Sequence, residues 1–323
     1  MSTTDWPDVQ LHVVSGKGGT GKTTVASALA LALARDGRRV LVMEVEGRQG
    51  LSQVFESPPL PYAERRLVTV SGGGEVWGLA VDPEEALLDY LELFYNLRRA
   101  GGVLRRMGAV EFVTTIAPGL RDVLLTGKAV ELVRRSDKKH DTPYDAIVLD
   151  APPTGRITRF LNVNTEIAGV AKVGPIRQQA DGVMAVLRSA RTAVHLVTIL
   201  EEMPVQETID GVAELHDSAL PVGGIVINMM RPPLLPEGNC EVPDAAQLDA
   251  GLAAAGLTAT STVIEALRGE AADHIARVAL EATERERLAV LDRPMYELPY
   301  LPGGMDLTGL QEMAVMLREQ GMA

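Results

Sequence analysis

Residues 16–24 read Gly16-Lys17-Gly18-Gly19-Thr20-Gly21-Lys22-Thr23-Thr24. An apolar run (residues 9–15) precedes this stretch, and a run rich in alanine and leucine (residues 25–34) follows it. The spacing G-x-x-x-x-G-K-T between a strand and a helix is typical of a phosphate-binding P-loop. Its glycines allow a tight turn that points several backbone N–H groups at one phosphate chain, and the N-terminus of the following helix adds positive potential. The stretch predicts a nucleotide site formed by Gly18, Gly19, Thr20, Gly21, Lys22, Thr23 and Thr24.

Three side chains in or near this pattern have predicted roles in phosphate chemistry. Lys22 occupies the position of the P-loop lysine that meets the β- and γ-phosphates, and Thr23 that of the hydroxyl that ligates Mg²⁺. Asp150 ends an apolar run, residues 144–150, as expected for a carboxylate that holds Mg²⁺ through water. The sequence therefore predicts ATP and Mg²⁺ as cofactors, with Thr23 and Asp150 on the metal side.

The order of the elements indicates an α/β fold. A short apolar run at residues 39–43 follows the P-loop helix after a helix-stop signal, Asp36-Gly37. Strand, helix and strand in this order form a βαβ unit, which predicts a mostly parallel sheet flanked by helices. Further strands are expected near residues 67–81, 144–150, 194–200, 221–228 and 295–298. We expect one P-loop domain over residues 1–323, with a helical subdomain inserted at about 83–140 and 156–190.

Composition narrows the class of protein. The 323 residues carry a formal charge of −12 and are 46% hydrophobic, which indicates a globular chain and argues against non-specific binding to nucleic acid. The N-terminus has no basic and apolar leader, and residues 25–34 are too few to span a bilayer. A single cysteine, Cys240, excludes an internal disulfide. We therefore expect a cytoplasmic protein.

Two motifs carry a resemblance to a known family. Lys17, directly after the first glycine, makes the pattern K-G-G-x-G-K-T, which resembles the deviant P-loop of dimeric nucleoside triphosphatases. Residues 150–161, D-A-P-P-T-G-R-I-T-R-F-L, closely resemble the D-T-A-P-T-G-H-T-L-R-F-L segment of the arsenite-pump and tail-anchored-protein-targeting ATPases. Arg156 stands where that family has histidine.

The resemblance implies further site residues. Lys17 would act on the nucleotide of a partner subunit, so a homodimer or a heterodimer with a related subunit is implied. The stretch 150–161 would be switch II, which links hydrolysis to movement of the helical subdomain. Glu46 takes the place of the aspartate that orients the attacking water, and Gln49 could share that role. Since glutamate is one methylene longer, hydrolysis could be slow. Asn228, Pro299 and Leu301 would lie near the adenine base.

Two acidic residues after the second strand have a plainer interpretation. Glu44 and Glu46 could belong to a solvated acidic loop with no catalytic role.

The cysteine count argues against two ligands found in the resembling family. One cysteine supplies neither the several thiols with which the arsenite pumps bind metalloid nor the C-x-x-C pair that clamps zinc, so neither arsenite nor zinc is expected.

We therefore predict an ATP hydrolase whose nucleotide-driven dimer closure handles an apolar client or a membrane-protein partner. Apolar residues in the helical insert, among them Ala86, Leu87, Met107, Phe112 and Met184, could line a client groove or simply pack together. One alternative is a nucleotide-binding structural or regulatory subunit of a hetero-oligomeric ATPase, with weak activity of its own. Another is a partitioning or positioning ATPase that works on a DNA or membrane surface.

Overall fold

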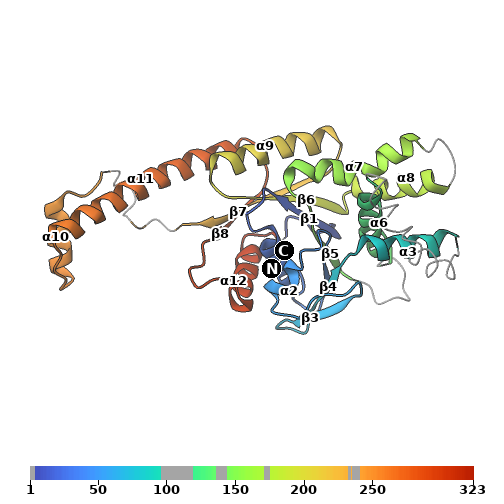
Figure 1. Ribbon diagram of the computed structural model, residues 1–323, viewed down its shortest axis with the longest axis horizontal. Coiled ribbons are helices and arrows are strands. Elements are labelled where there is room, and N and C mark those ends of the chain that lie inside the picture. Colours follow the sequence, from blue (N-terminus) through green and yellow to red (C-terminus); the bar gives the residue numbers. More distant parts are fainter. Residues whose placement is uncertain (1–3, 96–118, 136–143, 171–174, 232–233, 235–240) are drawn as a thin grey trace.

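The computed structural model describes residues 4–95, 119–135, 144–170, 175–231, 234 and 241–323. They form one sheet of eight strands in the order β3-β4-β2-β5-β1-β6-β7-β8 (Figure 1). All neighbouring strands pair in parallel except β3 and β4, which form an antiparallel hairpin at one edge. The α/β class and the mostly parallel sheet predicted from the sequence are confirmed.

The elements follow one another in the order β1 (Leu11–Gly16), α1 (Lys22–Leu33), β2 (Arg39–Glu44), α2 (Gly50–Val54), β3 (Arg65–Thr69), β4 (Glu75–Ala80), α3 (Pro83–Tyr95), α6 (Leu120–Arg135), β5 (Ala146–Asp150), α7 (Thr154–Val170), α8 (Pro175–Leu187), β6 (Thr192–Thr198), α9 (Glu202–Asp217), β7 (Val222–Met230), α10 (Ala245–Ala254), α11 (Ser261–Ala289), β8 (Met295–Pro299) and α12 (Leu307–Glu319).

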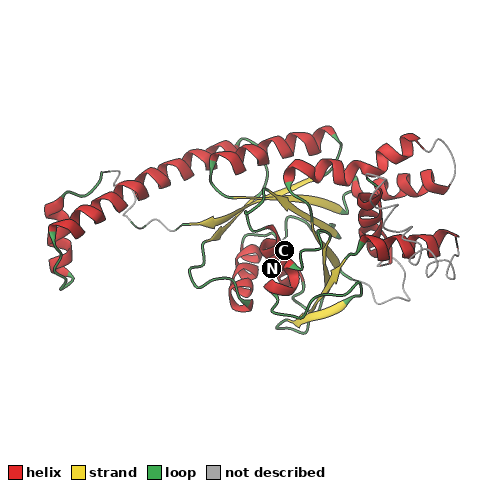
Figure 2. Ribbon diagram, in the orientation of Figure 1, coloured by secondary structure: helices red, strands yellow, loops and turns green. Residues whose placement is uncertain are grey.

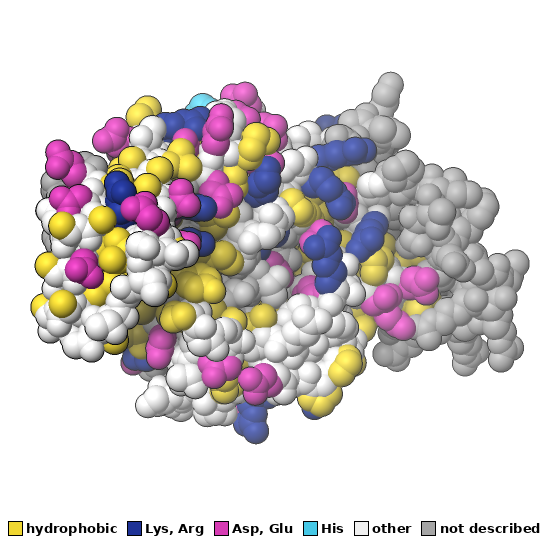
Figure 3. Space-filling view, turned by 60° about the vertical axis from the view of Figure 1, so that its left-hand side comes forward, with side chains coloured by type: hydrophobic (Ala, Val, Ile, Leu, Met, Phe, Trp, Pro, Cys, Tyr) yellow, Lys and Arg dark blue, Asp and Glu magenta, His cyan; other side chains and the backbone are white. Residues whose placement is uncertain are grey.

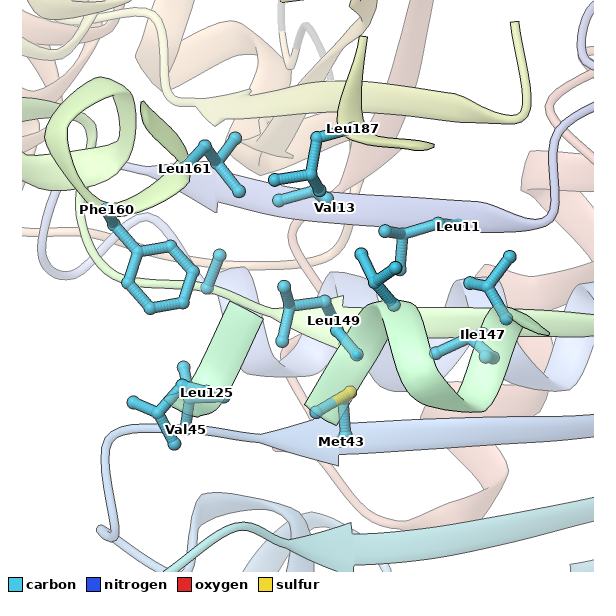
Figure 4. Close-up of a cluster of buried hydrophobic side chains, with 14 of the residues drawn as sticks. Leu11, Val13, Met43, Val45, Leu125, Ile147, Leu149, Phe160, Leu161 and Leu187 are labelled. Atoms are coloured by element: carbon cyan, nitrogen blue, oxygen red, sulfur yellow. The ribbon is translucent and has the colours of Figure 1, made fainter. Parts of the chain in front are cut away.

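The central strands are buried on both faces, which explains their continuous apolar runs. All six residues of β1 and all five of β5 are buried. Residues of alternating parity point to opposite sides of the sheet: Val13 and Leu149 belong to one core cluster, while Val14 and Val148 belong to the other. Figure 4 shows the first cluster, where Leu11, Val13 and Leu149 meet Leu125 of α6 and Phe160 of α7.

Each face of the sheet has its own helical layer. On one face α1 packs against α12, and both contribute to the core cluster that contains Val14. On the other face α7 and α9 lie against the central strands, and α6 and α8 pack beside α7 (Figure 2). The N- and C-terminal segments meet, since the backbone N–H of Asp5 donates to the carbonyl of Gly321 at 2.8 Å.

The described part of the helical insert is packed rather than open. Ala86 and Leu87 of α3 and Met184 of α8 are buried in the core cluster around α6, which agrees with the packing interpretation of these residues. Met107 and Phe112, also named as candidates for a client groove, lie outside the described residues. Within the described part of the chain, none of the helices has the length and apolarity that a membrane span needs.

Helices α10 and α11 form a long arm that projects from the sheet, a course that the sequence analysis does not predict. Helix α11 has 29 residues, about 43 Å of helix, and runs outward from the sheet with α10 packed at its far end (Figure 1). No residue of α10 is buried, and only Ile264, Glu284 and Leu288 of α11 are. Apolar side chains on the arm, such as Val263 and Leu267, are exposed beside acidic and basic ones (Figure 3).

Two stacked histidines lie buried between β1 and β6. His12 Nδ1 is 3.1 Å from His195 Nε2, and the rings stack with centroids 5.3 Å apart. The N–H of Gly224 donates to His195 Nδ1 at 3.1 Å, so the proton of a neutral His195 is on Nε2 and is donated to His12. Burial lowers the pKa of His12 to about 4 and that of His195 well below its ordinary value.

This pair predicts a defined acid sensitivity. In the folded state the pKa values of His12 and His195 lie below the unfolded value near 6.5. The contribution of the neutral pair to the free energy of unfolding is therefore fully present above that pH. The stabilisation is lost as the pH falls toward 4, by up to about 1.4 kcal/mol per pH unit for each histidine. Chemical denaturation from pH 7 to 4 should show a shallower loss of unfolding free energy in His12→Gln. The exposed His216→Gln should follow the wild type, and equal slopes in all three proteins would refute this account.

Candidate functional site

The carboxyl ends of three adjacent parallel strands meet at one edge of the sheet. In the strand register Asp150 of β5 lies opposite Val14 of β1 on one side and Glu44 of β2 on the other. A cavity of about 290 Å³ opens there. It is lined by Gly18, Gly19, Gly21, Lys22, Thr23, Thr24, Glu44, Glu46, Arg48, Gly50 and Asp150. Open α/β sheets bind their ligands at this carboxyl edge.

The backbone of the predicted P-loop is held tightly. Gly21 has φ of +85°, and a Cβ there would lie 2.4 Å from Nδ2 of Asn228. A Cβ on Gly16 would lie 2.1 Å from the carbonyl oxygen of Val197. The hydroxyl of Thr20 donates to the carbonyl of Lys17 at 2.9 Å, and this side chain is buried beneath the loop. These two glycines are therefore required by close contacts as well as by backbone angle.

An oxygen-rich corner lies at the start of α1. Thr23 Oγ1 donates to Oδ2 of Asp150 at 2.6 Å. Glu44 is 3% exposed; its Oε2 accepts from the N–H of Leu51 at 3.1 Å, and its Oε1 has no partner among the described residues. Burial raises the pKa of Asp150 to about 6, with the Thr23 hydrogen bond opposing the rise and the Glu44 carboxylate adding to it. Two buried carboxylates without a cation between them are costly.

This donor set fits Mg²⁺. The ion prefers oxygen ligands and is usually held by one or two carboxylates together with phosphates and water. Thr23, Asp150 and the free oxygen of Glu44 provide such a set, which agrees with the predicted metal role of Thr23 and Asp150. Glu44 is not part of a solvated acidic loop, because the sheet register buries it beside Asp150.

Lys22 and Arg48 are the cations among the described residues that line this cavity, and Lys22 comes from the P-loop. Burial lowers its pKa, and the neighbouring Asp150 and Glu46 carboxylates oppose that shift. Its Nζ lies 3.4 Å from the carbonyl oxygen of Lys17. Its position agrees with the predicted role at the β- and γ-phosphates.

Lys17 lies elsewhere, outside the lining of the cavity. Its ammonium forms an ion pair with Glu207 of α9. The other carboxylate oxygen of Glu207 accepts a 3.2 Å hydrogen bond from Thr154, the first residue of α7. A second contact joins the same regions, since the hydroxyl of Ser15 donates to the carbonyl of Pro152 at 2.7 Å. The P-loop, switch II and α9 are thus joined through side chains.

The loop after β2 brings Glu46 to the cavity but not Gln49. The side chain of Glu46 is 20% exposed, and Arg48 forms a loose ion pair with it at 3.8 Å. Both polar atoms of the Gln49 side-chain amide bond to the backbone of Leu60. Nε2 of Gln49 donates to the carbonyl of Leu60 at 3.1 Å, and Oε1 of Gln49 accepts from the N–H of Leu60 at 2.8 Å. The suggestion that Gln49 shares the water-positioning role is therefore wrong for this structure.

The residues expected near adenine lie outside the cavity lining. Asn228 is buried, and its Nδ2 donates to the carbonyl of Thr20 at 2.9 Å, so it braces the P-loop. Pro299 ends β8 opposite Met230, and Leu301 packs into the core cluster below. Their role toward the base stays a prediction.

Sequence reasoning left three residues of this region without a role. Glu44 was visible as an acidic residue at the end of a buried strand, two residues before Glu46. Glu207 gave no signal of its own, because its contact with Lys17 crosses 190 positions. Arg48 lies two residues after Glu46, and only the fold places it at the mouth of the cavity.

The parallel sheet, the P-loop at the head of α1 and the Thr23–Asp150 corner define a P-loop nucleoside triphosphatase. Residues 9–190 match the family model described as anion-transporting ATPase. ATPase BagA of Mycobacterium tuberculosis is 48% identical over 330 residues, covering 99% of this chain and 97% of that protein. The chain belongs to this arsenical-pump and GET3 family of ATPases, and it hydrolyses ATP.

Two more distant relatives indicate the breadth of the family. The arsenical pump-driving ATPase of Acidiphilium multivorum is 26% identical over 317 residues, covering 92% of this chain and 52% of that protein. ATPase GET3 of Podospora anserina is 26% identical over 204 residues, covering 63% of this chain and 57% of that protein.

The oxygen-rich corner predicts a specific metal defect. Glu44→Gln keeps an acceptor for the N–H of Leu51 but removes the charge beside Asp150. We expect the Mg²⁺ concentration for half-maximal ATP hydrolysis to rise roughly 10- to 100-fold, the usual effect of losing an outer metal partner. Titration of Mg²⁺ at fixed ATP measures it. Glu286→Gln, an exposed change on α11, is the control, and an unchanged Mg²⁺ dependence in Glu44→Gln would exclude Glu44 from the metal site.

Proposed function

We propose that this ATPase works as a dimer, in which ATP binding releases Lys17 from Glu207 and lets it reach the nucleotide of the partner subunit. Closure of that dimer, and its reopening after hydrolysis, would act on an apolar client or a membrane-protein partner. The observation that carries the proposal is the position of Lys17. In the single chain its ammonium is bound to α9 and does not line the phosphate cavity of its own subunit.

The chemistry assigned to each side chain follows from where charge develops. Lys22 and Glu46 both line the cavity. In the proposed mechanism Lys22 binds the phosphates from within the subunit, and Glu46 orients the attacking water. Lys17 adds a second cation at the γ-phosphate only when two subunits meet, which makes hydrolysis depend on assembly. Bound Mg²⁺, held through Thr23, Asp150 and Glu44, would neutralise charge on the phosphate oxygens.

The Glu207 contacts provide a path from the nucleotide to the helices. Thr154 begins α7, and α7 packs against α6, α8 and α9. When Lys17 leaves Glu207, the carboxylate that accepts from Thr154 is no longer tied to the P-loop. We propose that the resulting shift of α7 passes to the helical insert, as expected for switch II.

The class of client rests on the resemblance of residues 150–161 and on the cysteine count. A single cysteine cannot collect a metalloid with several thiols, so an apolar or membrane-protein client is preferred to arsenite. Exposed apolar side chains on the arm support a role in binding protein. Family membership favours this proposal over a DNA- or membrane-surface positioning ATPase. A regulatory subunit of a hetero-oligomer is the second candidate, supported by glutamate in place of the family aspartate.

Replacement of Lys17 tests the proposal. Lys17→Ala should bind ATP like the wild type but hydrolyse it about 10²- to 10³-fold more slowly, the usual cost of losing one preorganised donor to the transition state. Glu46→Gln should also bind ATP, because Lys22 is intact, but should hydrolyse it slowly because it lacks the carboxylate proposed to orient the attacking water. An equal mixture of the two variants should recover activity, because a mixed dimer contains one complete composite site. Failure of the mixture to exceed either variant alone would show that Lys17 acts within its own subunit.

A second prediction concerns the resting position of Lys17. Glu207→Gln removes the charge that holds the ammonium while keeping an acceptor for Thr154. A partly exposed ion pair is worth up to about 1 kcal/mol, so dimerisation should need roughly two- to fivefold less ATP. Sedimentation velocity across an ATP titration measures the shift. If the variant needs as much ATP as the wild type or more, Glu207 does not restrain Lys17.

A further inference from the structure

A second cavity adjoins the nucleotide cavity and has no role in the site described so far. Its volume is about 210 Å³. It shares Glu46 and Arg48 with the first cavity and continues between switch II and α6, where Arg121, Asp122 and Arg156 line it. Because Glu46 and Arg48 line both cavities, the second cavity meets the first at the loop after β2.

Three arginines from three different elements line this cavity. Arg48 comes from the loop after β2, Arg121 from the first turn of α6 and Arg156 from the first turn of α7. A guanidinium has five N–H donors in a planar fork that suits oxyanions. Three such groups from separate segments of the chain form a site that the fold assembles and that no single motif encodes.

The two carboxylates of the cavity leave much of this donor capacity unused. Arg48 is 3.8 Å from Glu46, and Arg156 is 3.8 Å from Asp122, both longer than a charge-assisted hydrogen bond of about 2.8 Å. Arg121 donates to the carbonyl of Val45 at 3.2 Å. Counting formal charges, three arginines and two carboxylates give the lining a net positive charge. Burial raises the pKa of Asp122, and the neighbouring Arg156, Arg121 and Arg159 oppose that rise.

We propose that this cavity binds inorganic phosphate and receives the phosphate that ATP hydrolysis releases. The proposal rests on the ATPase activity of the chain: water adds to the γ-phosphorus, the bond to the bridging oxygen breaks, and ADP, phosphate and a proton result. The cavity has room for a tetrahedral oxyanion with a few waters, each of which takes about 30 Å³ in the liquid. It is smaller than the neighbouring nucleotide cavity, and phosphate is the anion produced beside it.

The location gives the bound phosphate a consequence. Arg156 lies on switch II, Arg121 lies on the helical insert, and Val45 and Glu46 lie on the loop after β2. A phosphate bonded to both arginines would hold these segments together after the bond to ADP has broken. Its departure, rather than bond cleavage, would then free the switch and the helices.

The test uses the full chain saturated with Mg-ADP, so that the β-phosphate position of the P-loop is occupied before the anion is added; the arginine variants then distinguish the second cavity from the empty γ-phosphate position. Isothermal titration with sodium phosphate, at ionic strength held constant with chloride, should show one phosphate per chain. Arg121→Gln and Arg156→Gln should each weaken it by about tenfold or more, the effect of one charge-assisted hydrogen bond. The glutamine amide in Arg121→Gln retains a donor for the carbonyl of Val45. Arg134→Gln, at the other end of α6, is the matched control and should bind phosphate like the wild type.

A kinetic measurement separates this proposal from the proposed dimer cycle. Added phosphate should inhibit steady-state hydrolysis in the wild type without being overcome by ATP, and the inhibition should weaken in Arg121→Gln and Arg156→Gln. Two outcomes would overturn the phosphate site, whatever Lys17 does. Phosphate could bind equally well to the wild type and both variants, or it could fail to bind to the Mg-ADP complex. If the site is present while the Lys17 and Glu46 variants fail to complement each other, the phosphate site stands and the composite dimer site falls.

Discussion

The hydrogen bond from Thr23 to Asp150 joins the first turn of α1 to the end of β5, and the geometry of the site depends on it. Parallel pairing places Glu44 beside Asp150 on the next strand, so three oxygen-bearing side chains meet where the P-loop closes. Both carboxylates are buried, and burial raises the pKa of Asp150 to about 6. A corner of this kind is costly when empty and favourable once a divalent cation and phosphates arrive, which is a physical reason for nucleotide and metal to bind together.

A similar balance of charge appears at Lys17 on the other side of the loop. In the single chain the Lys17 ammonium is paired with Glu207. In the proposed dimer this lysine would leave Glu207 only while it contacts the second subunit. Because the Glu207 carboxylate also accepts a hydrogen bond from Thr154, it links Lys17 to the start of α7. In the proposed dimer, the departure of Lys17 from Glu207 would be the first change that reaches α7 and the helices packed against it.

The sequence was sufficient for the sheet, the P-loop and the Asp150 partner, because each depends on local patterns: a buried apolar run, fixed glycine spacing, a carboxylate at a strand end. Contacts between distant segments were not accessible in this way. The pairing of Lys17 with Glu207, the burial of Glu44 and the meeting of Arg48, Arg121 and Arg156 all follow from strand register and helix packing. The arm is a different case, since its helical pattern was visible but its outward course was not: a helix with alanine on several faces can lie against a sheet or project from it.

Arg156 shows how one departure from the family pattern connects these observations. Where the resembling segment has histidine, this chain has a permanent cation that faces Asp122 on α6 and lines the second cavity. A histidine there would be mostly neutral near pH 7 and could bind an oxyanion only weakly, whereas an arginine remains charged and offers a fork of donors. Glu46 lines both cavities, so the residue proposed to orient the attacking water also borders the proposed phosphate site. In that mechanism the extra methylene of glutamate, compared with aspartate, would let the carboxylate reach the water from a loop that also leaves space for the departing anion.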